Sequence, residues 1–224
     1  ARKPCHLTPN VPMPPRKLKI HAHPAPKPSG RPPVLFVHGA YTNALGWKLN
    51  FIPYLNARGH DCFALDLSGH GESEGQDVLD SFRLADYADD VAQAVATLPG
   101  EPVLVGHSMG ALVVQLYLAR ARAAGVALLA PVPPTGTGGS ASRLALLQPD
   151  FFSELPKVIA GRPDEHTLRV MAEVYFSPDM PHHDVLQFMP MIQAESEHAV
   201  AEMLALPFMA VKRRPDIPAL VMGG

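Results

Sequence analysis

The sequence predicts an α/β fold, with a doubly wound, mostly parallel sheet and an inserted block of helices. Short apolar runs typical of buried strands alternate with helical patterns over residues 17–131. A glycine-flanked serine, Ser108, directly follows one of these runs. From about Pro133 the alternation gives way to helical stretches separated by prolines. The length of 224 residues suits one domain of this kind with an insertion.

The beginning of the chain is rich in proline and is expected to lie along the surface. Proline cannot pair continuously in a sheet, so residues 1–16 are predicted to form a tail. Just after it, Leu18, Ile20 and Ala22 alternate with lysine and histidine. This period of two predicts a half-buried edge strand.

The other strands are predicted from short apolar runs bounded by turn residues. Runs of this length, rich in valine and leucine, are typical of strands covered on both faces. We therefore expect a parallel sheet whose strands are connected by right-handed crossovers. The predicted strands cover residues 34–37, 62–65, 102–105, 126–130 and 219–222.

Helices are predicted between these strands, over residues 43–58, 81–98 and 109–122. Pro53 should bend the first of them. In the second, apolar residues recur at helical spacing and form one stripe. Asp86, Asp89 and Asp90 fall largely off that stripe, so we expect them to face solvent.

The block after the fifth strand differs from the rest of the chain and is predicted to be a helical cap. It opens with a linker-like stretch of Pro, Thr, Gly and Ser, and it contains many of the methionines and phenylalanines. The predicted organisation is the first part of the core over residues 1–132, the cap over 133–215 and the start of a late core strand over 216–224.

Ser108 occupies the centre of the pentapeptide Gly106-His107-Ser108-Met109-Gly110. The two glycines permit a turn so tight that the middle side chain is pushed into an exposed, strained position. The N-terminus of the following helix would lie beneath the serine and favour negative charge there. Ser108 is therefore the candidate nucleophile.

Three motifs in this order resemble the α/β-hydrolase superfamily, in its lidded esterase, lysophospholipase-like and carbon–carbon hydrolase branches. Residues 36–39 resemble its strand and oxyanion loop. Residues 66–73 resemble its D-x-x-G-x-G-x-S loop, and residues 106–110 resemble its nucleophile elbow. The resemblance covers residues 17–131 well and the predicted cap loosely.

The resemblance implies a role for each motif. Ser108 would attack a carbonyl carbon and form an acyl-enzyme. The backbone N–H groups of Ala40 and Met109 would stabilise the oxyanion. Neighbouring side chains are expected to support these loops, and the two histidines among them are not expected to be bases. The supporting residues are His38, Gly39, Gly106, His107 and Gly110.

A nucleophilic serine needs a general base, and that base needs an orienting acid. In this superfamily the acid and the histidine follow the serine in the chain, after late strands. Here the predicted strand 219–222 lies next to Gly224, the last residue. We therefore expect the catalytic acid and histidine to lie outside this chain, which we interpret as a fragment.

The function predicted from these residues is that of a serine hydrolase acting on a carboxylester, thioester or lactone. One alternative is a non-catalytic hydrolase-like protein that binds a hydrophobic small molecule. Another is a nicked enzyme whose second fragment supplies the histidine and the acid. The substrate is expected to be apolar, because candidate pocket residues are mostly aromatic or apolar. These are Tyr41, Phe151, Phe152, Tyr175, Phe176 and Met189.

Composition argues against several other classes of function. The net charge of −2 gives no reason to expect nucleic acid as a partner. No apolar run reaches 18 residues, so no membrane-spanning helix is expected. A cytoplasmic location is expected because no apolar segment follows the basic start, although a removed signal peptide is left open. The sequence does not indicate an oligomeric state.

No cofactor or metal is expected. The sequence lacks a Walker A motif and a dinucleotide-binding fingerprint, since the glycines at 69 and 71 have no third partner at the required spacing. Residues 182–184, His-His-Asp, lie between prolines and are expected to form a surface turn. Spaced ligands typical of a zinc site are not seen there.

Overall fold

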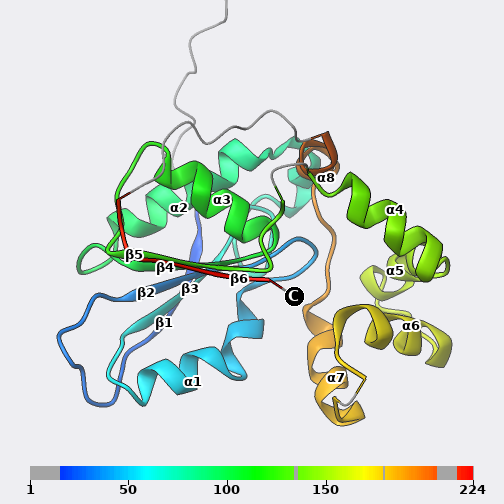
Figure 1. Ribbon diagram of the computed structural model, residues 1–224, viewed down its shortest axis with the longest axis horizontal. Helices are drawn as coiled ribbons and strands as arrows, with labels where there is room; N and C mark the ends of the chain where they lie inside the picture. The colour runs from blue at the N-terminus through cyan, green and yellow to red at the C-terminus, as the bar shows by residue number, and fades with distance from the viewer. Residues whose placement is uncertain (1–15, 134–135, 179, 206–215, 224) are drawn as a thin grey trace, which may run out of the picture.

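The computed structural model describes residues 16–133, 136–178, 180–205 and 216–223, and within them six strands form one sheet (Figure 1). The strand order is β1-β3-β2-β4-β5-β6. β1 is antiparallel to β3, and the other neighbours are parallel, which confirms the predicted fold class. The strands are β1 (Lys19–His23), β2 (Val34–Val37), β3 (Cys62–Asp66), β4 (Val103–His107), β5 (Gly125–Leu129) and β6 (Ala219–Met222).

Helices cover both faces of the sheet (Figure 1). Two long helices, α2 (Leu84–Ala96) and α3 (Met109–Leu118), lie on one face. The short helices η1 (Ala44–Lys48) and α1 (Phe51–Asn56) lie on the other. The larger apolar core fills the α2 and α3 side, and a smaller core lies beneath η1 and α1. Helices on both faces account for strands such as β2 that are buried along their whole length.

The single bent helix predicted over residues 43–58 is wrong in detail. The segment divides into η1 and α1, and Asn43 caps the first of these by accepting a hydrogen bond from the Leu45 N–H at 3.0 Å. Pro53 lies in the first turn of α1, where its missing N–H costs no helical hydrogen bond. The break therefore comes before Pro53 and not at it.

Two polar side chains predicted to face solvent are buried. Asp90 of α2 is 1% exposed, and it accepts hydrogen bonds from the Ser68 N–H and Ser68 hydroxyl at 2.8 and 2.9 Å. His21 of β1 faces inward and bonds Asp66 at 2.9 Å, whereas Ala22 is exposed. These partners replace water, which the hydropathy pattern alone does not register.

A helical segment over residues 138–205 lies beside the sheet (Figure 1). Its own apolar cluster, around Phe151, Leu155 and Met171, is separate from the two clusters of the sheet. No helix in the described ranges is long and apolar enough to cross a membrane. The elements are α4 (Gly138–Leu147), α5 (Phe151–Ile159), α6 (Glu165–Tyr175), α7 (His182–Phe188), η3 (Met189–Met191) and α8 (Glu197–Ala205).

Two expectations for this region differ in detail from the structure. The predicted linker ends early, because α4 begins at Gly138. The stretch His-His-Asp at 182–184 is the first turn of α7, so it is helical and not a loop, although His183 is exposed as expected. Residues 1–15 of the predicted tail, and residues 134–135, 179 and 206–215 of the predicted cap, lie outside the described residues.

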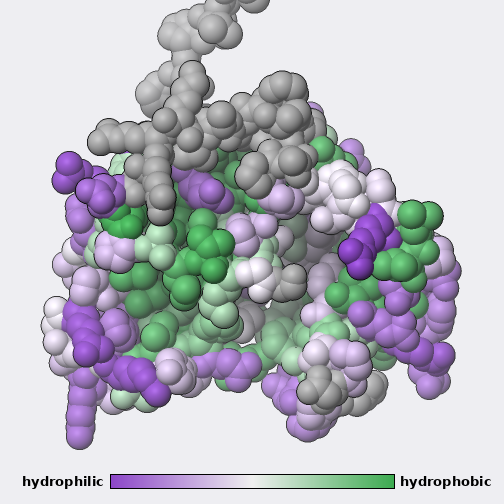
Figure 2. Space-filling view, in the orientation of Figure 1, coloured by the Kyte–Doolittle hydropathy of each residue, from purple (hydrophilic) through white to green (hydrophobic). Residues whose placement is uncertain are grey.

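The open edge of the sheet is apolar. Leu220, Val221 and Met222 of β6 are exposed by 54%, 63% and 51%. Figure 2 shows apolar side chains gathered over this part of the sheet, and a second apolar area lies on the helical segment near α4.

Gly110 allows α3 to approach the end of β2, which yields a stability prediction. A Cβ at this position would overlap the backbone oxygens of Val37 and His38. Gly110→Ala should therefore lower the free energy of unfolding by about 3 kcal/mol, measured by urea denaturation. Gly139→Ala, in open space within α4, should raise it by up to about 1 kcal/mol. Equal effects of the two substitutions would contradict this account of the close approach.

Candidate active site

Ser108 connects β4 to α3 in a strained conformation. Its φ of 51° and ψ of −116° lie where residues other than glycine are rare. The Ser108 N–H donates to the Leu129 carbonyl of β5 at 2.9 Å, and the Ser108 carbonyl accepts from the Ala111 N–H at 3.1 Å. These bonds hold the turn from both sides. The Ser108 side chain is partly exposed at the carboxyl end of the sheet.

The loop after β2 lies directly against this turn. β2 and β4 are neighbours in register, with Val37 opposite Gly106. A Cβ on Gly39 would lie 2.9 Å from His107 Nδ1 and 3.3 Å from Ser108 Cβ, so only glycine fits there. The structure thus brings the predicted oxyanion loop and the predicted elbow together.

The two predicted oxyanion donors are unused backbone groups. Within the described residues, neither the Ala40 N–H nor the Met109 N–H donates a hydrogen bond. Met109 is the first residue of α3, where the leading N–H groups have no partner inside the helix. Both amides therefore remain available to a ligand beside Ser108.

Both ring nitrogens of His38 are engaged in hydrogen bonds. Its Nε2 accepts a hydrogen bond from the Leu67 N–H at 3.1 Å, so Nδ1 carries the proton and donates to the Gly39 carbonyl at 2.8 Å. The ring is 1% exposed. Burial, helped by nearby His70, lowers the pKa of His38 to about 4. The ring thus connects Gly39 to Leu67, and the supporting role expected of His38 stays a prediction.

In the part of the chain that the structure describes, the Ser108 hydroxyl makes no hydrogen bond to a histidine. His107 is adjacent in sequence, but its side chain lies by Gly39 and is exposed. The expected absence of the catalytic acid and histidine from this chain stays a prediction.

Asp66, at the end of β3, connects two loops to strand β1. Its carboxylate accepts hydrogen bonds from the Ala44 N–H at 2.8 Å and from the Glu72 N–H at 3.0 Å, and it also bonds His21 at 2.9 Å. The carboxylate is buried, so these donors replace its water shell. Asp66 therefore shapes the loops around the site without facing Ser108.

Sequence analysis missed Glu195, which forms a buried pair with His70. Glu195 lies in the stretch between η3 and α8, and its Oε2 is 3.1 Å from His70 Nε2. His70 Nδ1 donates to the Ser68 carbonyl at 3.0 Å, so a proton on each ring nitrogen satisfies both contacts. No local pattern marks Glu195, because its partner is 125 positions away in the sequence.

The two partners of this pair stabilise each other's charge. Burial opposes the charged form of each, yet the hydrogen bond and the charge of Glu195 raise the pKa of His70. In the same way, His70, with further donors, lowers the pKa of Glu195 despite burial. Each partner therefore favours the charged form of the other, against the effect of burial.

The candidate pocket residues fall into two groups. Phe151 and Met189 are 6% and 7% exposed and belong to the apolar cluster of the helical segment, with Tyr41 and Phe176 packed against it. Phe152 and Tyr175 are 50% and 43% exposed. Their role in binding a substrate stays a prediction. The packing links Tyr41, next to the predicted oxyanion donor, to the helical segment.

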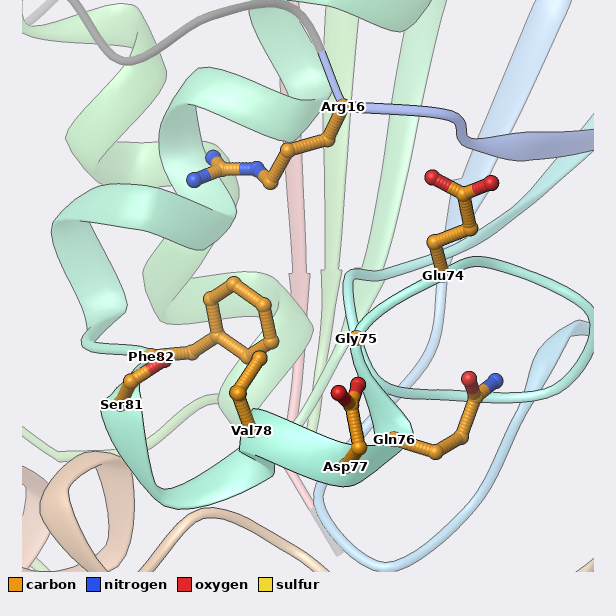
Figure 3. Close-up of a pocket in the computed structure, with 8 residues that line it drawn as sticks. All are labelled: Arg16, Glu74, Gly75, Gln76, Asp77, Val78, Ser81 and Phe82. Carbon is orange, nitrogen blue, oxygen red and sulfur yellow. The ribbon is translucent and has the colours of Figure 1, made fainter.

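A surface pocket of about 500 Å³ lies elsewhere on the molecule (Figure 3). It is formed by Arg16, the loop at residues 74–78, Ser81 and Phe82, and it includes none of the predicted catalytic residues. Arg16 is already engaged there, donating to Asp90 at 2.9 Å and to the Asp86 carbonyl at 2.8 Å. Among the described residues, no group of three or more potential metal ligands is present.

The low pKa of His38 predicts acid sensitivity of the fold. Between the ordinary value of 6.5 and about 4, unfolded His38 binds a proton that the folded protein excludes. Stability should therefore fall as pH drops through this range, by at most about 1.4 kcal/mol per pH unit from this group. His38→Gln should show a shallower decline in urea unfolding than the wild type. The same slope in both proteins would mean that His38 is protonated normally in the fold.

Comparison with known protein sequences identifies relatives of this chain. The sequence model of the family described as having the α/β-hydrolase fold matches residues 32–214. Methylesterase 3 of Arabidopsis thaliana is 36% identical over 81 residues, which are 35% of this chain and 30% of that protein. The probable esterase PIR7A of Oryza sativa is 32% identical over 146 residues, which are 61% of this chain and 54% of that protein. The chain thus spans about half or less of the length of these relatives.

Solved structures share the fold at low sequence identity. An esterase from Exiguobacterium antarcticum has a TM-score of 0.67 at 17% identity, over 92% of this chain and 76% of that one. An enol-lactonase from Burkholderia xenovorans has a TM-score of 0.63 at 17% identity, over 92% and 78% of the two chains. The likeness at this identity concerns the fold. Since the family match covers most of its length, the chain belongs to the family of proteins with the α/β-hydrolase fold.

Proposed function

We propose that this protein is a serine hydrolase that cleaves a carboxylester, thioester or lactone with Ser108 as the nucleophile. The main support for this proposal is the arrangement of residues where β2 and β4 end. There, Ser108 at positive φ lies against Gly39, and within the described residues the N–H groups of Ala40 and Met109 donate no hydrogen bond. Such donors can stabilise an oxyanion. The methylesterase and probable esterase among the relatives support an ester-directed activity.

In the proposed reaction, Ser108 Oγ forms a bond to the substrate carbonyl carbon as a general base takes its proton. The carbonyl oxygen becomes the oxyanion and accepts hydrogen bonds from Ala40 and Met109. Collapse of this intermediate breaks the bond to the alcohol or thiol, which leaves with the proton. Water then attacks the acyl-enzyme and releases the carboxylic acid and Ser108.

The general base that activates Ser108 is neither His38 nor His70 in this proposal. His38 and His70 have both ring nitrogens engaged in hydrogen bonds, so neither fits the role. The pH dependence of kcat/KM reports the pKa of the base, whichever residue provides it. The helical segment would serve as a cap over the site, and its apolar cluster beside Tyr41 favours an apolar acyl group.

A second candidate function is binding without turnover. It is favoured by the lack of a hydrogen bond between the Ser108 hydroxyl and any histidine in the described residues. Such a protein would hold a hydrophobic small molecule between the sheet and the helical segment. Covalent labelling of Ser108 separates the two functions, because labelling needs an activated serine.

Replacing Ser108 by alanine should abolish both labelling and turnover. We expect a fluorophosphonate probe to label the wild-type protein, and kcat for p-nitrophenyl esters to fall at least about a thousandfold in Ser108→Ala. Ser142→Ala, at an exposed serine of α4, is the matched control and should keep both activities. A folded wild-type protein that neither labels nor turns over esters would favour the binding function.

Removing one oxyanion donor should impair chemistry more than binding. Ala40→Pro deletes the N–H, and we expect kcat to fall about 100- to 1000-fold. Ala40→Gly retains the N–H and is the control, and circular dichroism verifies that both variants fold. A kcat for Ala40→Pro close to that of Ala40→Gly would remove Ala40 from the proposed oxyanion hole.

A further inference from the structure

Tyr41, which directly follows the proposed oxyanion donor Ala40, has a strained backbone. Its φ is 63°, in the left-handed region that residues other than glycine seldom adopt. Such a conformation persists only where surrounding contacts enforce it. The contacts of Tyr41 therefore bear on the geometry of the proposed oxyanion hole.

Both backbone groups of Tyr41 are held by one distant stretch of chain. The Tyr41 N–H donates to Glu195 Oε2 at 3.3 Å, and the Tyr41 carbonyl accepts from the Gln193 N–H at 2.9 Å. Residues 193–195 lie between η3 and α8 of the helical segment. The strained residue is thus clamped by the segment that would form the cap.

Glu195 is itself fully engaged. The residue is 7% exposed, and besides Tyr41 its carboxylate faces three donors, His70 Nε2 at 3.1 Å, the Tyr87 hydroxyl at 2.8 Å and the Ser196 N–H at 2.8 Å. These four donors match the acceptor capacity of an ionised carboxylate. Its position is therefore set by α2, by the loop after β3 and by its own backbone.

We propose that Glu195 is a positioning residue of this hydrolase: held by His70 and Tyr87, it fixes the Tyr41 backbone and thereby aims the Ala40 N–H at the oxyanion. The inference rests on the proposed function of Ser108 and Ala40. Glu195 does not touch the reacting atoms, and it acts through the peptide that joins Ala40 to Tyr41. It also connects the placement of the helical segment to the geometry of the oxyanion hole.

Glu195→Gln tests this role, because the variant keeps the volume but loses one of the two acceptor oxygens. We expect kcat to fall about 10- to 100-fold while KM changes less than about threefold, since misplacing a catalytic donor affects the transition state. Glu197→Gln, at an exposed position two residues away, is the matched control and should leave both constants unchanged. Equal kcat values for the two variants would overturn the proposal.

A second readout does not depend on catalysis. Hydrogen exchange of the Tyr41 amide, measured by NMR, should be slow in the wild-type protein and at least about tenfold faster in Glu195→Gln. Amides of α3 should be unaffected. If the wild type proves inactive on esters, the proposed function fails, and this exchange measurement alone decides whether Glu195 holds Tyr41. An unchanged exchange rate of the Tyr41 amide in Glu195→Gln would overturn the proposal that Glu195 holds Tyr41.

Should Glu195→Gln fail to fold, Glu195→Asp serves in its place. The shorter side chain retains a charge for His70, but it draws the carboxylate back from the point where Glu195 Oε2 contacts both His70 and Tyr41. Lower kcat and faster Tyr41 exchange at retained stability would support positioning. Wild-type values for both would show that the ion pair only holds the segment in place, and would overturn the proposal.

Discussion

The close approach of α3 to the loop after β2 is the constraint on which the candidate site depends. Gly110 leaves no space for a side chain between α3 and the backbone oxygens of Val37 and His38, and Gly39 leaves none against His107 and Ser108. The two glycines therefore bring the start of a helix and the end of a neighbouring strand into backbone contact. The Ala40 and Met109 amides, which donate no hydrogen bond within the described residues, consequently lie near the carboxyl ends of neighbouring parallel strands.

Buried polar groups hold the surrounding loops in place. Asp66 accepts hydrogen bonds from Ala44 and Glu72, Asp90 holds Ser68, and the His38 ring connects Gly39 to Leu67. Each of these groups is costly to bury alone and is stable only because it has specific partners. The loops therefore keep one arrangement, which hydrophobic burial by itself would not select.

The sequence predicts well what depends on local pattern. The strands are apolar because helices cover both faces of the sheet, and the strained turn at Ser108 follows from its flanking glycines. Features that depend on distant partners were missed. Asp90 lies off the apolar stripe of α2, yet Ser68 and Arg16 bury it, and Glu195 pairs with His70 across 125 positions. The hydropathy pattern predicts neither pairing, because each of these polar side chains is buried against a specific partner that takes the place of water.

Tyr41 connects the loop after β2 to the helical segment. Its side-chain contacts and its backbone hydrogen bonds have different consequences. Its side chain packs against the apolar cluster of the helical segment, and this burial contributes stability with little directional preference. Its backbone groups bond Gln193 and Glu195, and those bonds do set a direction. Under the proposed function, the apolar cluster therefore contributes to the stability of the helical segment, whereas the bonds to residues 193 and 195 contribute to the geometry beside Ala40.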